Sequence, residues 1–175
     1  MTGHGKVRGN PHIDQLAQLV QAGGRKESGQ VEPKIITKNE MMLVGMTSDG
    51  SDICGLWAKF GEKERAIRHK IEGTTYEWHD WDARKCMVAA EVTQVESVPE
   101  GMSVMHLPAG QYAIFTHRLA SGGYEGLNSI MHEWLTTGPY EQVGDDSVQV
   151  FDERFKGGDK PDSEIDFWIP IRPRK

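Results

Sequence analysis

The sequence of 175 residues contains no apolar run near the roughly 20 residues that a membrane-spanning helix needs. Its first residues lack the apolar core of a secretory signal, so we expect a cytoplasmic protein rather than a secreted or membrane-bound one. Cysteine is scarce, and Cys54 and Cys86 lack the spacing of a metal site. We expect both to be buried thiols rather than the two halves of a disulfide.

The sequence also lacks the motifs that mark common catalytic chemistries. No Ser, Cys or Lys lies in a recognised nucleophile motif, and no glycine-rich loop is placed to bind phosphate. His132 and Glu133 are not followed by the second histidine of a zinc-protease helix. His106 and His117 point to opposite faces of one predicted strand unless a bulge lies between them. We therefore expect no metal and no cofactor.

Positive charge is in short supply over most of the chain. The formal net charge is −6, and basic residues outnumber acidic ones only in the N-terminal segment. An acidic body argues against direct nucleic-acid binding, which needs many Lys and Arg contacts to phosphate. It mildly favours cationic ligands.

Residues 1–32 are predicted to be a flexible appendage, rich in Gly, Lys, Ser and Gln. Within it, Asn10 can cap and Pro11 can begin one short helix, which stops at Gly23. The apolar face of this helix would dock on the body, on a partner protein or on a second copy in a homodimer.

The remaining chain, residues 33–175, contains the same order of elements twice. The first repeat, about 34–95, predicts a long strand broken near Lys38, a helix and two further strands: 34–47, 52–70, 74–81 and 85–95. The second repeat, about 102–171, predicts a strand broken at Pro108, a helix bounded by glycines and two strands: 102–119, 124–137, 148–151 and 164–171.

A short unit that is repeated once buries its apolar face against its copy. We therefore expect an α+β fold in which duplicated βαββ units form an antiparallel sheet platform. Both helices are expected on one face of the sheet, with a ligand cleft between them, because interfaces of this kind are favoured binding places for small molecules.

Several strings carry a family resemblance: HLPAGQYAIFTH at 106–117, VQVFDERF at 148–155 and EIDFWIPI at 164–171, with GLWAKF at 55–60 and TYEWHDWD at 75–82 in the first repeat. Together they resemble the GyrI-like small-molecule-binding family over about residues 33–173. That family includes effector-binding halves of AraC-type and MerR-type multidrug regulators, separate binding proteins, gyrase-inhibitory proteins and some hydrolases of cyclopropane-containing compounds. The resemblance implies the duplicated βαββ fold with a pocket between its two helices.

Glu91 is the first candidate for this pocket. It follows the run Met87–Ala90, so both faces of its strand look buried, and a carboxylate there must be paired, hydrogen-bonded or protonated. The resemblance implies a pocket glutamate on this strand, and we expect Glu91 to be mostly buried and to contact the ligand. The alternative is a strand-end glutamate bonded to backbone or to a tyrosine hydroxyl.

Aromatic residues supply the other candidates. Trp57 and Trp134 lie at comparable places on the two predicted helices, where they could hold planar or cationic ligands or be ordinary core. Tyr112 could turn its hydroxyl into the same cavity. We also assign three apolar residues to the pocket lining: Phe60, Met131 and Trp168. His79 and the aspartates beside it are expected in a polar hairpin at the rim.

Gln149 is a departure from the family pattern. The resemblance implies a glutamate here that helps to bind cations, and this chain keeps only the hydrogen-bonding capacity. This predicts a pocket for neutral or singly charged ligands.

We therefore expect a protein that binds apolar, aromatic or weakly cationic small molecules, coupled to transcription regulation or to drug sequestration. One alternative is a hydrolase of reactive cyclopropane-containing electrophiles, in which Glu91 would act on the substrate. Another is a protein that interacts with gyrase or with a regulator. We expect a binding module rather than an enzyme, with no catalytic residue.

Overall fold

The computed structural model describes residues 32–175. The helix expected near Asn10 lies outside this described part of the chain. Within it, no helix is long and apolar enough to cross a membrane.

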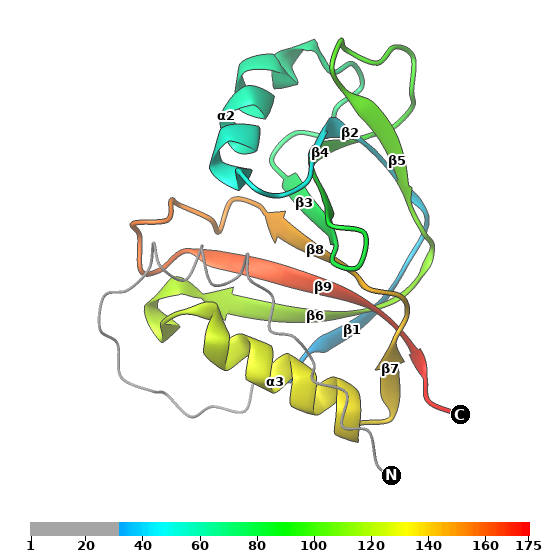
Figure 1. The fold of residues 1–175 in the computed structure, drawn as a ribbon, viewed down its shortest axis with the longest axis vertical. Coiled ribbons are helices and arrows are strands. Elements are labelled where there is room, and N and C mark those ends of the chain that lie inside the picture. The colour runs from blue at the N-terminus through cyan, green and yellow to red at the C-terminus, as the bar shows by residue number, and fades with distance from the viewer. Residues whose placement is uncertain (1–31) are drawn as a thin grey trace.

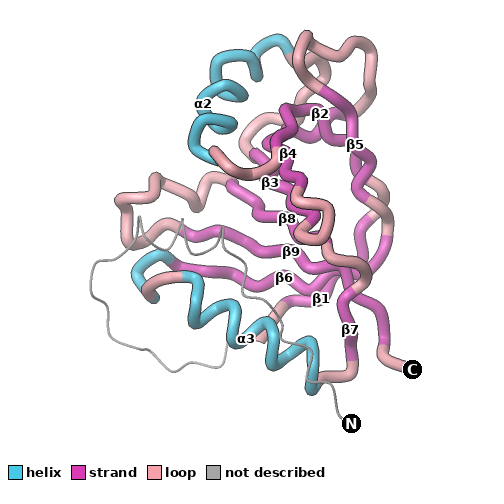
Figure 2. Tube along the Cα trace, in the orientation of Figure 1, coloured by secondary structure: helices cyan, strands magenta, loops and turns pink. Residues whose placement is uncertain are grey.

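The first repeat contains β1, β2, α2, η1, β3 and β4, with the bounds Lys34–Lys38, Met41–Ser48, Ile53–Lys63, Glu64–Ala66, Thr75–Asp80 and Lys85–Val92. The second contains β5, β6, η2, α3, β7, β8 and β9, with the bounds Ser103–Leu107, Gly110–Arg118, Leu119–Ser121, Tyr124–Thr137, Tyr140–Gln142, Asp146–Phe151 and Glu164–Pro173. Figure 1 shows both helices on one side of a curled antiparallel sheet, and Figure 2 shows the loops between its strands. The predicted α+β class and duplicated βαββ arrangement are confirmed.

The order of the strands shows how the repeats join. The sheet runs β1-β6-β9-β8-β3-β4-β2-β5, with β7 added beside β9. β1 of the first repeat pairs with β6 of the second, and β5 of the second pairs with β2 of the first. The order is therefore symmetric about the contact between β8 and β3, which places a pseudo-twofold axis at the centre of the sheet.

The predicted strand breaks arise where the chain crosses between repeats. β1 and β2 are separated at Asn39 and Glu40, and β5 and β6 at Pro108 and Ala109. Proline has no N–H to donate to a neighbouring strand, so Pro108 interrupts the pairing. This interruption lies where the chain passes from one half of the sheet to the other.

Both helices begin and end for local reasons. The Asp52 side chain caps α2 by accepting a hydrogen bond from the Gly55 backbone N–H at 2.9 Å. α3 is bounded by Gly123 and Gly138, as predicted. The predicted extension of the first helix to residue 70 is wrong, because after Lys63 the chain makes a 3₁₀ turn and Ile67, in an extended conformation, packs into the core under α2.

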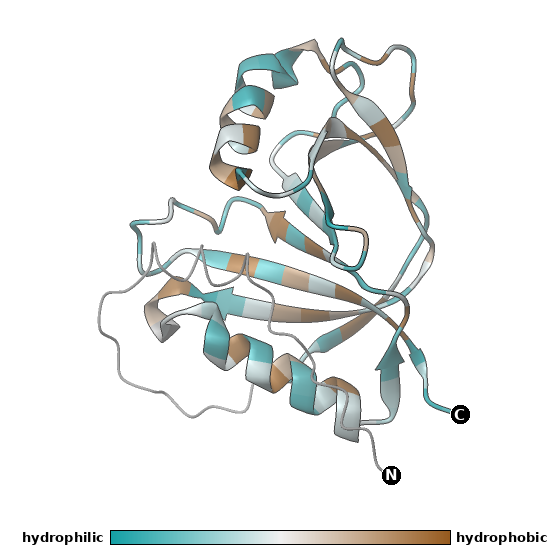
Figure 3. Cartoon of the chain, in the orientation of Figure 1, coloured by the Kyte–Doolittle hydropathy of each residue, from teal (hydrophilic) through white to brown (hydrophobic). Residues whose placement is uncertain are grey.

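The apolar side chains form three clusters. One joins α3 to β6 and β9, and another joins α2 to β2 and β4. The third lies on the opposite face of the sheet and includes Tyr76, Met87, Tyr112, Val148 and Trp168. Figure 3 shows hydrophobic and hydrophilic residues alternating along part of β9. Successive side chains of this strand point to opposite faces, so Phe167 and Ile169 join the cluster under α3 and Trp168 joins the cluster on the other face.

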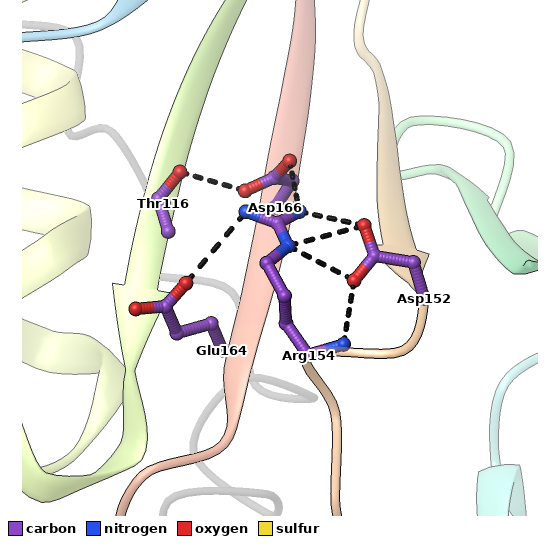
Figure 4. A network of polar contacts seen from close by, with 5 residues as sticks. All are labelled: Thr116, Asp152, Arg154, Glu164 and Asp166. Carbon is purple, nitrogen blue, oxygen red and sulfur yellow. Dashed lines mark hydrogen bonds and ion pairs between the residues drawn. The ribbon is translucent and has the colours of Figure 1, made fainter.

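An ion-pair network closes one end of the face away from the helices (Figure 4). Nη2 of Arg154 lies 2.8 Å from Asp152 and 2.6 Å from Asp166, and Nη1 lies 3.7 Å from Glu164. Thr116 donates to Asp166 at 2.7 Å. The carboxylates raise the pKa of the Arg154 guanidinium, and the network ties the turn after β8 to β9 and β6.

Candidate functional site

A row of side chains crosses the centre of the sheet on the face that the helices cover. Residues paired across neighbouring strands point to the same face, so the row follows from the strand register. It comprises Met46, Val88, Glu77, Gln149, Phe167 and Phe115. α2 packs over the end with Val88, and α3 packs over the end with Phe167. The two polar side chains at the middle of the row, Glu77 and Gln149, therefore lie between the helices.

Glu77 on β3 is the buried carboxylate of this row, with 2% of its surface exposed. Its Oε2 accepts a hydrogen bond from Nε1 of Trp57 at 2.6 Å, and its Oε1 lies 2.6 Å from Nε2 of His79. No Lys or Arg of the described residues pairs with it. Because a carboxylate out of water is costly unless its oxygens are hydrogen-bonded, Trp57 and His79 are what make this position tolerable.

Gln149 is the strand partner of Glu77 and is equally buried. Its Oε1 receives no hydrogen bond from the described part of the chain. Leaving a buried acceptor unpaired costs about 1–3 kcal/mol. A ligand that brings an N–H or O–H to this oxygen would recover that energy.

Aromatic rings surround the two polar groups. The half-buried Trp57 ring meets Phe151 edge-on, with 4.8 Å between ring centroids. The His79 ring stacks on Trp81 at 4.2 Å and 4° between planes. These rings give the polar pair an apolar border of the kind that binds planar or cationic groups.

Tyr124, the first residue of α3, packs its ring against Phe167 of the same row, with 5.4 Å between ring centroids, and Phe167 is the strand partner of Gln149. Burial, and after it the negative charge of Glu77, raises the pKa of the Tyr124 hydroxyl. The hydroxyl therefore stays protonated and can donate a hydrogen bond. We call Trp57, Glu77, His79, Tyr124 and Gln149 the central site.

The pseudo-twofold axis makes the positions of Glu77 and Gln149 equivalent. Positions 77 and 149 face each other across the axis, so each is the symmetry counterpart of the other. The family resemblance implies a glutamate at 149, where this chain has glutamine. The carboxylate here belongs to the other repeat, and the site is singly rather than doubly acidic.

The eight residues assigned to one pocket from the sequence divide between the two faces of the sheet. On the helix side are Trp57, Gln149, Phe60, Met131 and Trp134. On the opposite side are Glu91, Tyr112 and Trp168, which follow the strand parity of the third cluster. The expectation that they approach one cavity is therefore wrong. Phe60 and Met131 are buried core residues beneath their helices.

Glu91 corresponds to the alternative stated above, a glutamate near the end of its strand beside a tyrosine hydroxyl. It is half-buried rather than mostly buried, and the Tyr76 hydroxyl donates to its Oε2 at 3.4 Å. The Tyr112 hydroxyl donates to the Pro108 carbonyl at 2.6 Å, and its ring lies 6.1 Å from that of Trp168.

Trp57 and Trp134 are not counterparts. The buried residues of α2, Ile53, Leu56 and Phe60, have the same spacing as those of α3, Tyr124, Leu127 and Met131. This alignment places Asn128 opposite Trp57. Trp134 lies further along α3, where it stacks on Tyr140 with 5.7 Å between centroids.

Two further expectations need correction, one for His79 and one for Cys54. His79 is buried in the central site rather than at a polar rim. Cys54 is exposed, and only Cys86 is a buried thiol. His106 is exposed beside Glu40, whereas His117 is buried at the start of α3. No cluster of three or more metal-ligating side chains occurs within residues 32–175.

His117 should make stability depend on pH. Burial lowers the pKa of its imidazole from the ordinary 6.5, against a smaller effect of its hydrogen bond to the Gly122 carbonyl. Below pH 6.5 the unfolded chain takes up a proton that the folded imidazole resists, so stability falls as pH falls toward the lowered pKa. His117→Gln keeps a donor for Gly122 without the titration. We expect the free energy of unfolding, measured with urea, to fall more for the wild type than for the variant as the pH is lowered from about 7 to 5. The difference should be up to about 1.4 kcal/mol per pH unit. Parallel pH profiles would contradict this.

The arrangement of two helices over a curled sheet, with a buried polar pair between them, is that of an effector-binding domain. The chain belongs to the Cass2 family of integron-associated effector binding proteins, whose model matches residues 34–171.

Individual relatives agree with this family. The chain is 29% identical over 155 residues to the transcriptional regulator BrlR of Pseudomonas aeruginosa, which corresponds to 79% of this chain and 54% of BrlR. It thus spans about half the length of the curated relative that it matches.

Solved structures share the fold at low identity. EcmrR in a complex with DNA superposes with a TM-score of 0.65 at 12% identity, over 92% of this chain and 67% of that one. SAV2435 bound to tetraphenylphosphonium superposes with a TM-score of 0.58 at 15% identity, over 81% of this chain and 94% of that one.

Proposed function

We propose that the central site binds an apolar or aromatic small molecule that carries one positive charge or a hydrogen-bond donor. The observation that carries this proposal is Glu77, a carboxylate 2% exposed that lies between the two helices without a Lys or Arg partner among the described residues. An organic cation at this position would meet a negative charge that water screens poorly.

The neighbours of Glu77 support the same ligand class. Gln149 offers an unpaired acceptor, Tyr124 offers a protonated hydroxyl, and Trp57 offers an aromatic face on α2. The single carboxylate limits the charge that the site can balance, which favours monocations over dications.

Trp57 is the residue that a ligand would have to move. Its indole N–H now occupies Oε2 of Glu77, and the ring is half-buried at the edge of α2. In our proposal the ligand replaces this hydrogen bond and the indole packs against the ligand instead. Binding would then shift α2, whereas the sheet beneath keeps its register.

The relatives favour this ligand class and suggest its use. The solved SAV2435 complex contains tetraphenylphosphonium, a lipophilic monocation. BrlR is a transcriptional regulator, and EcmrR was solved with DNA. We propose that ligand binding in this chain likewise serves transcription regulation, with drug sequestration as the alternative use.

The test compares a charged and a neutral probe of similar shape. Tetraphenylphosphonium and triphenylphosphine oxide are titrated by calorimetry against the wild type and Glu77→Gln, which keeps groups that can bond to Trp57 and His79. We expect Glu77→Gln to reduce the affinity for tetraphenylphosphonium by about 10–100-fold, because two opposite unit charges about 6–8 Å apart attract by about 2–3 kcal/mol at an effective dielectric constant of about 20. The neutral probe should change by no more than about threefold.

Glu91→Gln is the matched control, since it removes a carboxylate from the opposite face of the sheet. It should leave both probes unchanged. The proposal fails if Glu91→Gln reduces the affinity for tetraphenylphosphonium as much as Glu77→Gln does. It also fails if Glu77→Gln reduces the affinity for both probes equally.

A further inference from the structure

A cavity of about 230 Å³ opens at the ends of β6, β8 and β9, away from the central site. Its lining is Leu107, Pro108, Ala109, Gly110, Gln111, Tyr112, Val143, Gly144, Asp146, Val148, Pro170 and Ile171. Tyr112 and Val148 belong to the cluster on the face opposite the helices. Because Val148 and Gln149 are consecutive in β8, their side chains point to opposite faces, and the sheet separates this cavity from the central site.

Asp146 is the one charged residue of this lining. Its Oδ2 accepts a hydrogen bond from Nε1 of Trp78 at 3.2 Å, and no donor of the described residues reaches its Oδ1. That oxygen lies beside Gly144, which has no side chain to cover it. One carboxylate oxygen is thus held in place while the other remains available.

The electrostatic surroundings of Asp146 are negative. Partial burial raises the pKa of its carboxyl, and the charges of Asp80 and Asp145 add to this effect. The charge of Asp146 in turn contributes to the raised pKa of the Tyr112 hydroxyl. Lys38, whose strand partner Gly110 lines the cavity, places its ammonium over the Trp168 ring, 4.5 Å from the centroid. Among residues 32–175, no Lys or Arg therefore forms an ion pair with Asp146 at the acidic end of the cavity.

The rest of the lining is mainly apolar. The Tyr112 hydroxyl already donates a hydrogen bond to the Pro108 carbonyl, so a ligand in the cavity would contact the Tyr112 ring rather than the hydroxyl. The volume is below the roughly 300–1,000 Å³ of pockets that hold drug-sized ligands. A metal ion does not suit it either, because Ca²⁺ takes about six to eight oxygen ligands and one carboxylate stands alone here.

We propose that this cavity is a second ligand site, for a small primary or secondary amine on a short apolar body. The ammonium group donates to Oδ1 of Asp146, and the apolar body lies against Tyr112, Val148 and Pro170. The site is distinct from the central site in position, in the size of its ligand and in the carboxylate that binds it.

Benzylamine and its neutral analogue benzyl alcohol test this proposal by amide chemical-shift titration. Benzylamine should shift the amide signals of Ala109, Gly110 and Gly144 and leave that of Glu77 in place. Asp146→Asn should weaken benzylamine about tenfold or more, the expected loss of a charged hydrogen bond. Asp145→Asn, which removes a neighbouring charge outside the lining, should bind within about twofold of the wild type.

A second variant guards against indirect effects of Asp146→Asn. Ala109→Phe keeps the carboxylate and fills the cavity, and it should abolish the benzylamine shifts while tetraphenylphosphonium binding is retained. The proposal is overturned if benzyl alcohol binds as tightly as benzylamine, if Asp146→Asn binds benzylamine as the wild type does, or if the shifts occur at the central site instead.

Discussion

Gln149→Glu should destabilise the protein at neutral pH by about 2–4 kcal/mol, and the loss should shrink as the pH falls. Position 149 faces Glu77 directly across β3 and β8, where side chains of a cross-strand pair lie about 5 Å apart. Two buried carboxylates at this separation cannot both ionise cheaply, so the pair keeps a proton.

The direction of the pH effect follows from this proton. The introduced carboxyl group has a folded pKa above its unfolded value of about 4.3. The free energy of unfolding of the variant is therefore closest to that of the wild type below the unfolded pKa, and it falls as the pH rises through the raised folded pKa. Urea unfolding at about pH 5 and pH 8 measures the difference. Tetraphenylphosphonium should bind the variant more tightly than the wild type, because the cation favours release of the shared proton.

A double variant separates charge repulsion from simple misfit. Glu77→Gln combined with Gln149→Glu moves the single carboxylate to its symmetry counterpart and removes the repulsion. We expect most of the lost stability to return. Recovery should be incomplete, because Trp57 and His79 bond the carboxylate at 77, whereas their counterparts at 128 and 151 are Asn and Phe. If the double variant is no more stable than Gln149→Glu alone, repulsion between carboxylates is not the cause.

The repeated element order was predictable from the sequence because it rests on local signals. The breaks after Lys38, at Asn39, and at Pro108, and the glycines around α3, lie where Asn, Pro and Gly are expected to interrupt or end an element. β7 was missed, since three residues are too few to show a periodicity and their pairing with β9 is long-range.

Glu77 was missed because a strand pattern shows which residues share a face of the sheet but not which face the helices cover. Tyr76 and Trp78 alternate with Glu77 and His79, which suggests an aromatic face inside and a polar face in water. The helices in fact cover the polar face at the sheet centre, so Glu77 and His79 are buried as Tyr76 is, while Trp78 is half-buried. One available signal was the alignment of TYEWHD with SVQVFD, which puts Glu77 at the position of Gln149 in the other repeat.

Glu91 illustrates the converse. Its neighbours are apolar on both sides, which correctly indicates a strand with two covered faces. The parity of Met87 and Ala89 places Glu91 on the face away from the helices. The face that carries the helices depends on the handedness of the β2-α2-β3 and β6-α3-β8 crossovers, each of which joins two parallel strands on either side of a third. Residue spacing alone does not give this strand order.

Gly45→Ala should cost about 3–5 kcal/mol, a loss that few single substitutions reach. A Cβ at this position would lie 2.0 Å from the Val88 carbonyl oxygen and 2.5 Å from Cα of Ala89. Both atoms are backbone of β4, so no side-chain rotation relieves the overlap, and β2 must move away from its partner strand. Since β4 carries Ala89 directly against Tyr76 of β3, the strand that holds Glu77, the shift should also loosen the central site.

Gly61→Ala is the matched control for Gly45→Ala. Gly61 is exposed within α2, and a Cβ there would meet nothing within 4 Å. Alanine should therefore raise stability by about 0.5–1 kcal/mol through helix propensity and a less flexible unfolded chain. Urea unfolding of the two variants should move the midpoint in opposite directions. A Gly45→Ala protein as stable as the wild type would show that β2 and β4 are not locked at this point, and that the sheet centre tolerates sliding of its strands.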